Sequence, residues 1–249
     1  MSQLDLERAL RRAQGPSVVA YLTGGHPDRD AFLRCLASLE HEADAIEIGI
    51  PFSDPMADGA TIQRASGVAL AAGATLGGIL ADLASHPAKR PRVLMSYLNP
   101  LLSLAPGELA PRLRAALVSG VVVPDLPFEE SGALRAALAA EDIALVPMIT
   151  PLTSEARMHA IVAAARGFVY AVTSTGITGQ RIDASDALRR YLERARATSP
   201  VPVIAGFGVR TRDHVAALCP PADGVVVGSA IVEAVEAGAP LDALVRSLR

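Results

Sequence analysis

Residues 120–150 read GVVVPDLPFEESGALRAALAAEDIALVPMIT: an apolar run, a short loop, a segment rich in Ala, Leu and Arg, and a second apolar run. The two apolar runs, 120–125 and 144–150, are almost uninterrupted, as in strands that a parallel sheet buries on both faces. The segment between them has apolar residues at the spacing of an amphipathic helix. This stretch therefore predicts a strand, a helix and a second strand.

The same order repeats along the chain. Further apolar runs cover residues 17–23, 45–50, 92–97, 168–173, 202–208 and 223–228, each followed by a helix-like segment. Eight strands alternating with helices, without a linker or a change in composition, predict an α/β fold: a closed (β/α)8 TIM barrel that forms a single domain over residues 1–249. An open, doubly wound sheet is the alternative, but the turn after the first run reads TGGHPD instead of GxGxxG.

The charged residues argue against several functions. The 23 basic and 26 acidic residues give a net charge of −3, whereas nucleic acid binding depends on clustered positive charge. Only one basic residue is a lysine, Lys89, and it lies in the turn-like stretch SHPAKRP, so a Schiff-base mechanism is not expected. The five histidines form no HxH or HxxxH pair, and we expect no metal site.

Three features of the sequence predict a soluble, cytoplasmic protein without a membrane segment. Asp5 and Glu7 interrupt the N-terminal segment, where a signal peptide needs an apolar run. The longest uncharged stretch, 65–81, is broken by glycines and is shorter than the ~20 apolar residues that span a membrane. Cys35 and Cys219 form no CxxC pair, which fits a reducing compartment.

Glu47 lies within the predicted strand 45–50, AIEIGI. Because side chains alternate along a strand, we expect Glu47 and Gly49 to face the barrel axis while the three isoleucines face the helices. No interior lysine and no obvious arginine on a neighbouring strand is available to pair with this carboxylate, so its burial is unfavourable. Two interpretations remain: a glutamate hydrogen-bonded as a feature of packing, or a general acid/base whose pKa is raised by burial.

The loop after this strand, PFSDPMADG at 51–59, carries Asp54 and Asp58. Aspartate in such a loop ordinarily shapes a turn or caps a helix, which accounts well for Asp54. It accounts less well for Asp58, because Thr61 can cap the helix that follows. The loops after barrel strands meet at one mouth, so we expect Asp58 near Glu47, where two carboxylates in different surroundings can divide acid and base roles.

Glycine-rich turns follow the last three predicted strands: STGITGQ at 174–180, GFG at 206–208 and GSA at 228–230. Backbone amides at such turns and at helix N-termini bind phosphate without a lysine, and barrel enzymes frequently hold phosphate after their last two strands. Tyr21 and Tyr97 lie near the ends of the first and third strands. They are either core packing or a contact for a flat aromatic substrate.

The segment PFSDPMADGATIQRA at 51–65, with Glu47 just upstream, resembles the signature of the tryptophan synthase α subunit family. Similar segments continue in the same order: LMSYLNP, VVVPDLP, STGITG, AGFGV and VVVGSAIV. The resemblance implies a barrel lyase of tryptophan biosynthesis that cleaves indole-3-glycerol phosphate to indole and glyceraldehyde 3-phosphate. It also implies a β subunit that binds pyridoxal phosphate, in an assembly of two α with two β subunits. This chain itself is expected to hold no cofactor.

The resemblance also assigns residues. It makes Glu47 and Asp58 the catalytic pair. The substrate-binding residues that it implies are Tyr21, Tyr97, Thr178, Gly179, Phe207, Gly208, Gly228 and Ser229. The segments that it implies to touch the β subunit contain Asp54, Asn99, Pro100 and Asp125. Residues 173–181 correspond to a mobile loop in which Thr178 meets Asp58 when the loop closes.

The implied reaction is a retro-aldol cleavage. Glu47 protonates carbon C3 of the indole, and Asp58 stabilises the charge that forms on the ring nitrogen. The chain departs from the family at His26, and also at Ala60, a position where proline is usual. Neither position touches the implied chemistry. Pro111 lies in a segment without the usual AGxxG ending, near the expected partner face.

Three other functions remain open. One is a free-standing lyase that releases indole without a partner, and the intact PFSDP and NP segments favour the subunit over it. Another is a barrel retained as a non-catalytic subunit, against which the presence of Glu47 and Asp58 argues. The third is an isomerase of another phosphorylated metabolite, because such barrels share phosphate-binding turns. The PFSDPMADG loop counts against this isomerase.

Overall fold

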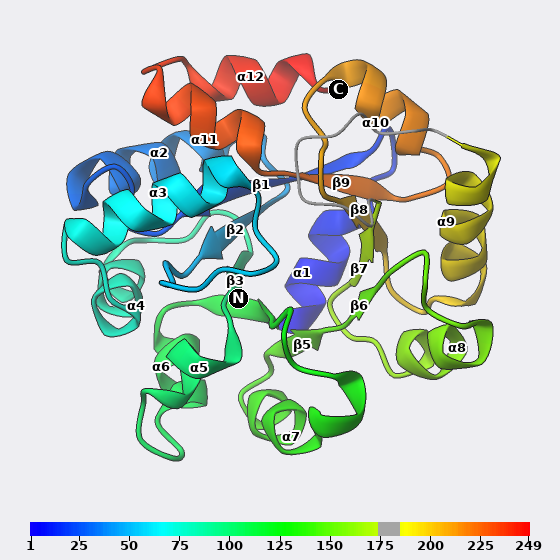
Figure 1. Cartoon of the computed structure of the whole chain (residues 1–249), viewed down its shortest axis with the longest axis horizontal. Coiled ribbons are helices and arrows are strands. Elements are labelled where there is room, and N and C mark those ends of the chain that lie inside the picture. Colours follow the sequence, from blue (N-terminus) through cyan, green and yellow to red (C-terminus); the bar gives the residue numbers. More distant parts are fainter. Residues whose placement is uncertain (174–184) are drawn as a thin grey trace.

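One parallel sheet organises the computed structural model, which describes residues 1–173 and 185–249 (Figure 1). Its strands are β1 (Ser17–Thr23), β2 (Ala45–Gly49), β3 (Arg92–Met95), β4 (Val118–Val122), β5 (Ala144–Val146), β6 (Met148–Ile149), β7 (Val169–Val172), β8 (Val203–Gly206) and β9 (Gly224–Val227). They neighbour one another in the order β5-β4-β3-β2-β1-β9-β8-β7-β6, all in parallel pairs. Only Pro147 separates the two ends of this row, β5 and β6.

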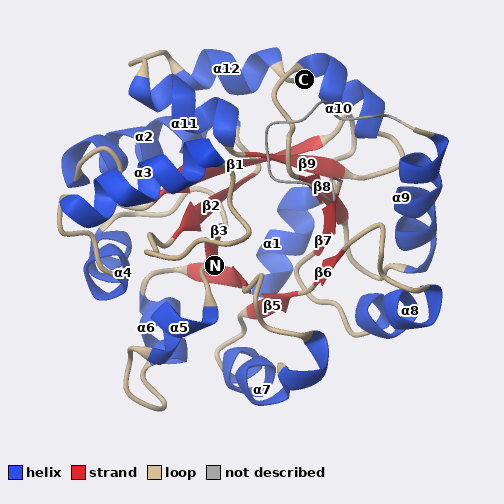
Figure 2. Ribbon diagram, viewed as in Figure 1, coloured by secondary structure: helices blue, strands red, loops and turns tan. Residues whose placement is uncertain are grey.

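The sheet therefore curls into a nearly closed barrel, and the predicted (β/α)8 fold is confirmed. The open, doubly wound alternative is excluded, because the strands follow the chain around the sheet without the reversal of order that defines such a sheet. In Figure 2 the strands form an inner ring, and the helices other than α1 lie around its outside.

The eight predicted strands become nine because Pro147 divides the fifth. Proline has no N–H group to donate to a strand ladder. Its carbonyl still accepts a hydrogen bond from the Tyr170 amide at 2.9 Å, which keeps this part of the chain against β7. The third and fourth predicted strands also end earlier than expected, at Met95 and Val122.

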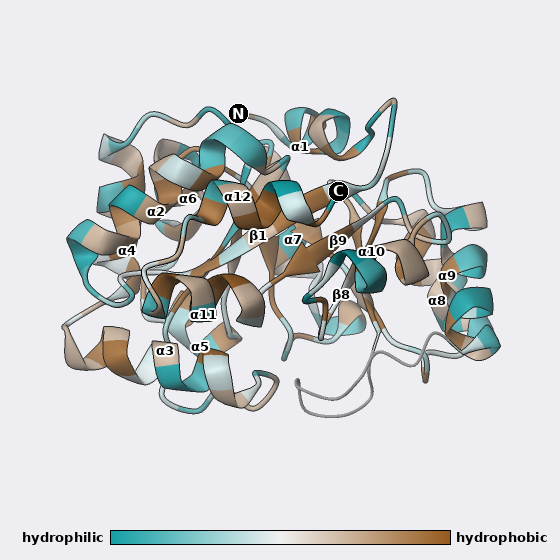
Figure 3. Cartoon of the chain, turned by 90° about the horizontal axis from the view of Figure 1, so that it is seen from above, coloured by the Kyte–Doolittle hydropathy of each residue, from teal (hydrophilic) through white to brown (hydrophobic). Residues whose placement is uncertain are grey.

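Helices cover the outside of the barrel. They are α2 (Arg29–Glu42), α3 (Ala60–Ala71), α4 (Leu76–Ser85), α5 (Leu98–Leu102), α6 (Leu109–Ala115), α7 (Gly132–Ala140), α8 (Glu155–Ala163), α9 (Asp186–Thr198), α10 (Arg212–Leu218), α11 (Ser229–Glu236) and α12 (Leu241–Ser247), with a 3-10 turn, η1, at Phe128–Glu130. Each turns an apolar stripe toward the strands; in α2 the fully buried members are Phe32, Leu36 and Leu39. In Figure 3 the strands are mostly hydrophobic, whereas hydrophilic residues lie on outer helices such as α9.

The first helix, α1 (Gln3–Leu10), has a different place from the others. It lies across the middle of the ring in Figure 1. Its Leu6 and Leu10 are fully buried and pack with the inward-facing strand residues. Leu6 lies so close to Gly120 and Gly167 that an added Cβ at either glycine would touch it. Gly167 lies two residues before β7, and the Gln3 amide of α1 donates at 3.0 Å to the carbonyl of Asp142, two residues before β5. The helix α1 therefore closes the N-terminal end of the barrel and leaves the C-terminal end open.

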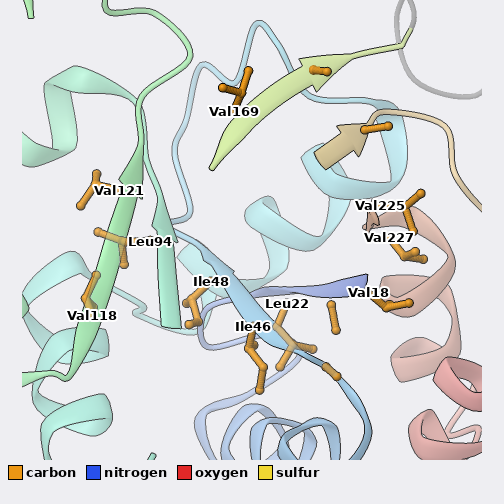
Figure 4. Close-up of a cluster of buried hydrophobic side chains, with 14 of the residues drawn as sticks. Val18, Leu22, Ile46, Ile48, Leu94, Val118, Val121, Val169, Val225 and Val227 are labelled. Carbon is orange, nitrogen blue, oxygen red and sulfur yellow. The ribbon is translucent and has the colours of Figure 1, made fainter. Parts of the chain in front are cut away.

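Strand residues alternate between two hydrophobic layers. Ile46 and Ile48 of β2 point outward into the layer between strands and helices, which Figure 4 draws with Leu22, Leu94 and Val121. The intervening residues point inward and form a second cluster inside the barrel. The expected orientation of β2, with its isoleucines outward and Glu47 inward, is confirmed.

No single helix among the described residues is long and apolar enough to span a membrane. The helices α3 and α4 meet the length and hydropathy criteria only together, and the chain bends by 88° between them.

Candidate active site

A pocket opens at the C-terminal end of the barrel, opposite α1. Its lining comes from strand ends and from the loops after β2, β8 and β9: Tyr21, Glu47, Asp58, Ile62, Met95, Tyr170, Phe207, Gly208, Val209, Val226, Gly228 and Ser229. Seven residues named from the sequence therefore lie together here: Tyr21, Glu47, Asp58, Phe207, Gly208, Gly228 and Ser229. The structure does not describe the predicted Thr178 and Gly179, which fall within residues 174–184.

Glu47 is held in the barrel wall between Tyr21 of β1 and Val93 of β3. Its side chain is 1% exposed, and within the described residues its Oε2 atom has no hydrogen-bond partner. Burial raises the pKa of Glu47 to about 8, and the negative charge of Asp58 adds to the shift. Glu47 is therefore a neutral carboxylic acid at pH 7, ready to donate a proton.

An arginine does lie on the neighbouring strand, but it faces away from the pocket. Arg92 begins β3, is fully buried among the helices and pairs with Glu40 of α2 at 3.2 Å. Its guanidinium also donates to the carbonyls of Leu83, at 2.7 Å, and His86, at 3.1 Å. The expectation that a neighbouring strand carries no obvious arginine is thus wrong, but Arg92 pairs with Glu40, and Glu47 has no cationic partner among the described residues.

Asp58 shares the pocket but lies in different surroundings. It is 8% exposed, and burial raises the pKa of Asp58 to about 6, while a hydrogen bond from the Tyr97 hydroxyl opposes the shift. Its backbone is fixed by a turn, in which its amide donates to the Pro55 carbonyl at 3.1 Å, and by Gln63, whose side chain donates to its carbonyl at 2.8 Å. At pH 7 Asp58 is therefore mostly ionised, beside a neutral Glu47.

The sequence suggests Thr61 as the cap of the helix after Asp58, and this prediction is wrong. Gly59 is the N-cap of α3, without a side-chain cap. Thr61 instead donates its hydroxyl to Glu233 of α11 at 3.2 Å. Asp58 is thus free of a capping role and points its carboxylate into the pocket.

Tyr97 lies behind Asp58 and is absent from the pocket lining. Its hydroxyl accepts a hydrogen bond from the Ala57 amide at 2.9 Å, and its ring packs on Phe52 with centroids 5.2 Å apart. Burial and the charge of Asp58 raise the pKa of Tyr97, so its hydroxyl stays protonated and able to donate. These contacts hold the loop that carries Asp58, while direct contact of Tyr97 with substrate stays a prediction.

Two tyrosines cross the barrel mouth at the level of Glu47. Tyr21 and Tyr170 are each 4% exposed and lie directly over Gly49 and Gly206, where any side chain would collide with the rings. Tyr170 also meets Phe207 edge-on, with centroids 5.9 Å apart. Sequence reasoning missed Tyr170, although strand alternation puts it on the same inward face as Phe168 and Val172 and could have found it.

Amide groups rather than basic side chains face the other side of the pocket. Phe207 and Gly208 turn the chain after β8 with φ angles of 76° and 84°, and the Thr173 hydroxyl donates to the carbonyls of Gly206 and Phe207 at 2.7 and 2.6 Å. Gly228 is the N-cap of α11, so the first amides of this helix are directed toward the pocket. Free amides at a helix start favour an anion such as phosphate.

The single lysine lies far from this pocket. Lys89 is exposed and precedes β3, at the barrel end opposite the pocket. Within residues 1–173 and 185–249 no three His, Cys, Asp or Glu side chains are grouped so that they could bind a metal ion.

A larger cavity lies outside the barrel, between the ends of β4–β6 and the helices α7 and α8. It measures about 320 Å³, against about 40 Å³ at Glu47. Asp125 is the one carboxylate in its lining, and it is exposed. Paired buried acids with shifted pKa values mark a catalytic site better than size does, so we assign the chemistry to the smaller pocket.

A family model described as tryptophan synthase alpha chain matches residues 8–246. The tryptophan synthase alpha chain of Desulfovibrio desulfuricans is 44% identical, and the match covers 93% of this chain and 92% of that one. The chain belongs to the tryptophan synthase alpha chain family. It is accordingly a lyase of tryptophan biosynthesis.

Solved structures of this family superpose closely on the chain. Tryptophan synthase of Mycobacterium tuberculosis matches with a TM-score of 0.88 at 37% identity, covering 99% of this chain and 95% of that one. The tryptophan synthase a2b2 complex of Pyrococcus furiosus matches with a TM-score of 0.85 at 36% identity, covering 93% and 97%. These neighbours support a partnership with a β subunit.

The raised pKa of Glu47 predicts a specific dependence of stability on pH. The neutral carboxyl favours the folded state, so its contribution is complete below the ordinary value of 4.5 and is lost as the pH rises through about 8. Glu47→Gln cannot ionise, and its free energy of unfolding should therefore rise relative to wild type between pH 4.5 and 8, then level off. Urea unfolding at pH 5, 7 and 9 measures this difference, and an equal difference at all three values would contradict the shift.

Proposed function

We propose that Glu47 and Asp58 carry the proton transfers by which this chain cleaves indole-3-glycerol phosphate to indole and glyceraldehyde 3-phosphate. The observation that carries the proposal is the pair of buried carboxylates at one barrel mouth, with pKa values of about 8 and about 6. Between these values the free enzyme holds one acid and one carboxylate, which is the division of roles that the reaction requires.

Glu47 acts first, as an acid. It donates its proton to carbon C3 of the indole ring, which leaves a positive charge on the ring nitrogen. The carboxylate of Asp58 stabilises that charge and accepts a hydrogen bond from the ring N–H. Asp58 is mostly ionised at pH 7 because the hydrogen bond from Tyr97 limits the effect of burial, and the pKa of Asp58 rises only to about 6.

Glu47, now ionised, acts next as a base. It takes the proton of the hydroxyl on the side-chain carbon bonded to C3, and the C–C bond breaks as that carbon becomes the aldehyde of glyceraldehyde 3-phosphate. The electron pair of the broken bond returns to the ring and neutralises the nitrogen. Glu47 ends the cycle protonated, so the overall change is the transfer of one proton from oxygen to carbon.

The remote phosphate orients the reacting carbon. We assign its binding to the turn at Phe207 and Gly208 and to the start of α11 at Gly228 and Ser229, where free amides are directed toward the pocket. The resemblance to the family adds Thr178 and Gly179 to the proposed substrate-binding residues. The aromatic side chains of Tyr21 and Tyr170 suit the flat face of indole, and contacts far from the reacting bond lower the barrier by holding the substrate in place.

Replacing either acid should abolish most of the activity without abolishing ligand binding. Glu47→Gln and Asp58→Asn are each expected to lower kcat for indole formation by about 10²–10⁴-fold, the usual contribution of a general acid or base. Affinity for glycerol 3-phosphate, measured by calorimetry, should change little because the phosphate contacts remain. Matched controls are Glu193→Gln and Asp242→Asn, exposed acids paired with Arg189 and Arg246. Near-normal turnover in Glu47→Gln or Asp58→Asn would remove the role assigned to that residue.

A surface beside the pocket suits the β subunit. We propose that the partner covers the loop after β2, helix α5 and the loop after β4, which carry Asp54, Asn99, Pro100 and Asp125. Support comes from two large apolar side chains at this end of the barrel, Met56 at 80% and Leu102 at 69% exposed. The Asp125 carboxylate accepts a hydrogen bond from the Leu98 amide at 2.9 Å and so fixes the start of α5.

The full assembly is proposed as two α with two β subunits, with pyridoxal phosphate on the β subunit and none on this chain. We also propose that it works in the cytoplasm, which suits the two free thiols of Cys35 and Cys219. The free-standing lyase is the alternative, and family membership favours the subunit over it.

A charge placed on the proposed partner surface should separate binding from chemistry. Leu102→Asp is expected to weaken affinity for the β subunit at least tenfold, because a charge would be buried at the interface, while basal indole formation stays unchanged. The control is Leu4→Asp, since Leu4 is 52% exposed on α1 at the opposite end of the barrel. Indole formation with and without β subunit also decides the alternative: strong turnover that the β subunit leaves unaltered would favour a free-standing lyase.

A further inference from the structure

One glutamate on α11 joins segments of the active site that are far apart in the sequence. The Thr61 hydroxyl donates to Glu233 Oε1 at 3.2 Å. Arg210 Nη1 donates to the same oxygen at 3.1 Å, and Arg210 Nη2 donates to Glu233 Oε2. Both oxygens of Glu233 are thus occupied, by an α3 residue and by a residue of the loop after β8.

Each end of this network adjoins a residue that the proposed mechanism uses. Thr61 lies three residues after Asp58, in the first turn of α3. Arg210 lies two residues after Gly208, at the end of the turn that faces the pocket. Glu233 itself lies four residues after Ser229, which puts the two on one side of α11, a single helical turn apart.

A contribution to the free energy of unfolding does not explain why Thr61, Arg210 and Glu233 are joined in this way. The side chains of Arg210 and Glu233 are 41% and 39% exposed, and ion pairs at such exposure add little to the free energy of unfolding. The helices α3 and α11 are also tied elsewhere, because Arg64 donates to both oxygens of Glu236 at 3.1 and 2.8 Å. The pairing with Arg210 lowers the pKa of Glu233, so the bridging carboxylate stays charged.

We propose that Glu233 is a positioning residue that couples the Asp58 segment to the phosphate-binding turns. Through Thr61 it fixes the start of α3, and with it the direction of the Asp58 carboxylate. Through Arg210 it fixes the turn at Phe207 and Gly208 against α11. Phosphate bound at those turns thereby sets where Asp58 meets the indole ring. The inference rests on the roles proposed above for Asp58 and for the two turns.

Variants that remove one connection at a time test this coupling. Thr61→Val should lower kcat with little change in KM, because only the Asp58 side is released. Arg210→Gln should raise KM and weaken binding of inorganic phosphate, because only the turn is released. Glu233→Ala should do both and lower kcat/KM about tenfold, less than the 10²-fold loss that a 1 Å misplacement can cause. Glu233→Gln keeps an acceptor for Thr61 and should restore kcat but not KM.

Two further readouts distinguish positioning from simple support of the fold. In the Glu233→Ala background, Thr61→Val and Arg210→Gln should add almost no further loss, whereas independent structural effects would add. Glu193→Gln removes a comparable exposed pair with Arg189 on α9 and should leave all constants unchanged.

Unchanged constants in Glu233→Ala, or additive losses in the double variants, would overturn the proposal. If the wild type formed no indole, the proposed function would fail. The phosphate titrations of Glu233→Ala and Arg210→Gln would still decide the coupling, because they require no turnover.

Discussion

The proposed chemistry of this barrel depends on a carboxyl group, Glu47, that has no cationic partner among the described residues. Glu47 projects from the middle of β2 into the barrel, 1% exposed, where water cannot solvate its ionised form. The one arginine on the adjacent strand, Arg92, lies in the outer layer and is occupied by Glu40. The negative charge of Asp58 opposes a second negative charge on Glu47, so burial and Asp58 together favour the protonated form of Glu47. A neutral acid inside a barrel follows from this arrangement.

The rest of the fold keeps that acid buried while leaving it one opening. The helix α1 fills the N-terminal end through Leu6 and Leu10, so the pocket opens only toward the C-terminal loops. Tyr21 and Tyr170 lie over glycines and narrow the mouth at the level of Glu47. The amides at the start of α11 give the pocket a second side, where we propose that phosphate binds without a cationic side chain that would favour ionised Glu47. The proposed phosphate site, built from amides, is therefore compatible with a neutral glutamate, whereas a lysine in the same place would favour the ionised form of Glu47.

Much of this arrangement could be predicted from local sequence pattern. Alternation along AIEIGI predicts both the outward isoleucines and the inward glutamate, because the strand period of two residues leaves no other choice. The same alternation explains why the Arg92 side chain points outward, because Arg92 lies two residues before the outward-facing Leu94 of β3. Pro147 splits the fifth strand because proline has no N–H group to donate. The proline is visible in the sequence, but the apolar pattern by itself predicts one continuous strand.

Other features depend on contacts that no local pattern contains. Thr61 is a reasonable helix cap by sequence, but an acceptor 172 residues away, Glu233, binds its hydroxyl instead. Tyr97 reads as a residue of the barrel mouth, and the structure puts it behind Asp58, bonded to the Ala57 amide. Tyr170 lay within a recognised strand, yet its importance appears only when Gly206 and Phe207 are seen around it.

The decisive property is the protonation state of Glu47 in the free enzyme. Carbon-13 NMR of protein labelled at the glutamate side-chain carboxyl, with the Glu47 signal assigned by its loss in Glu47→Gln, follows this group through a pH titration. We expect a protonated carboxyl at pH 7 and a midpoint near 8. A midpoint near the ordinary value of 4.5 would mean that Glu47 is ionised at neutral pH, and the acid at the centre of the mechanism would be absent.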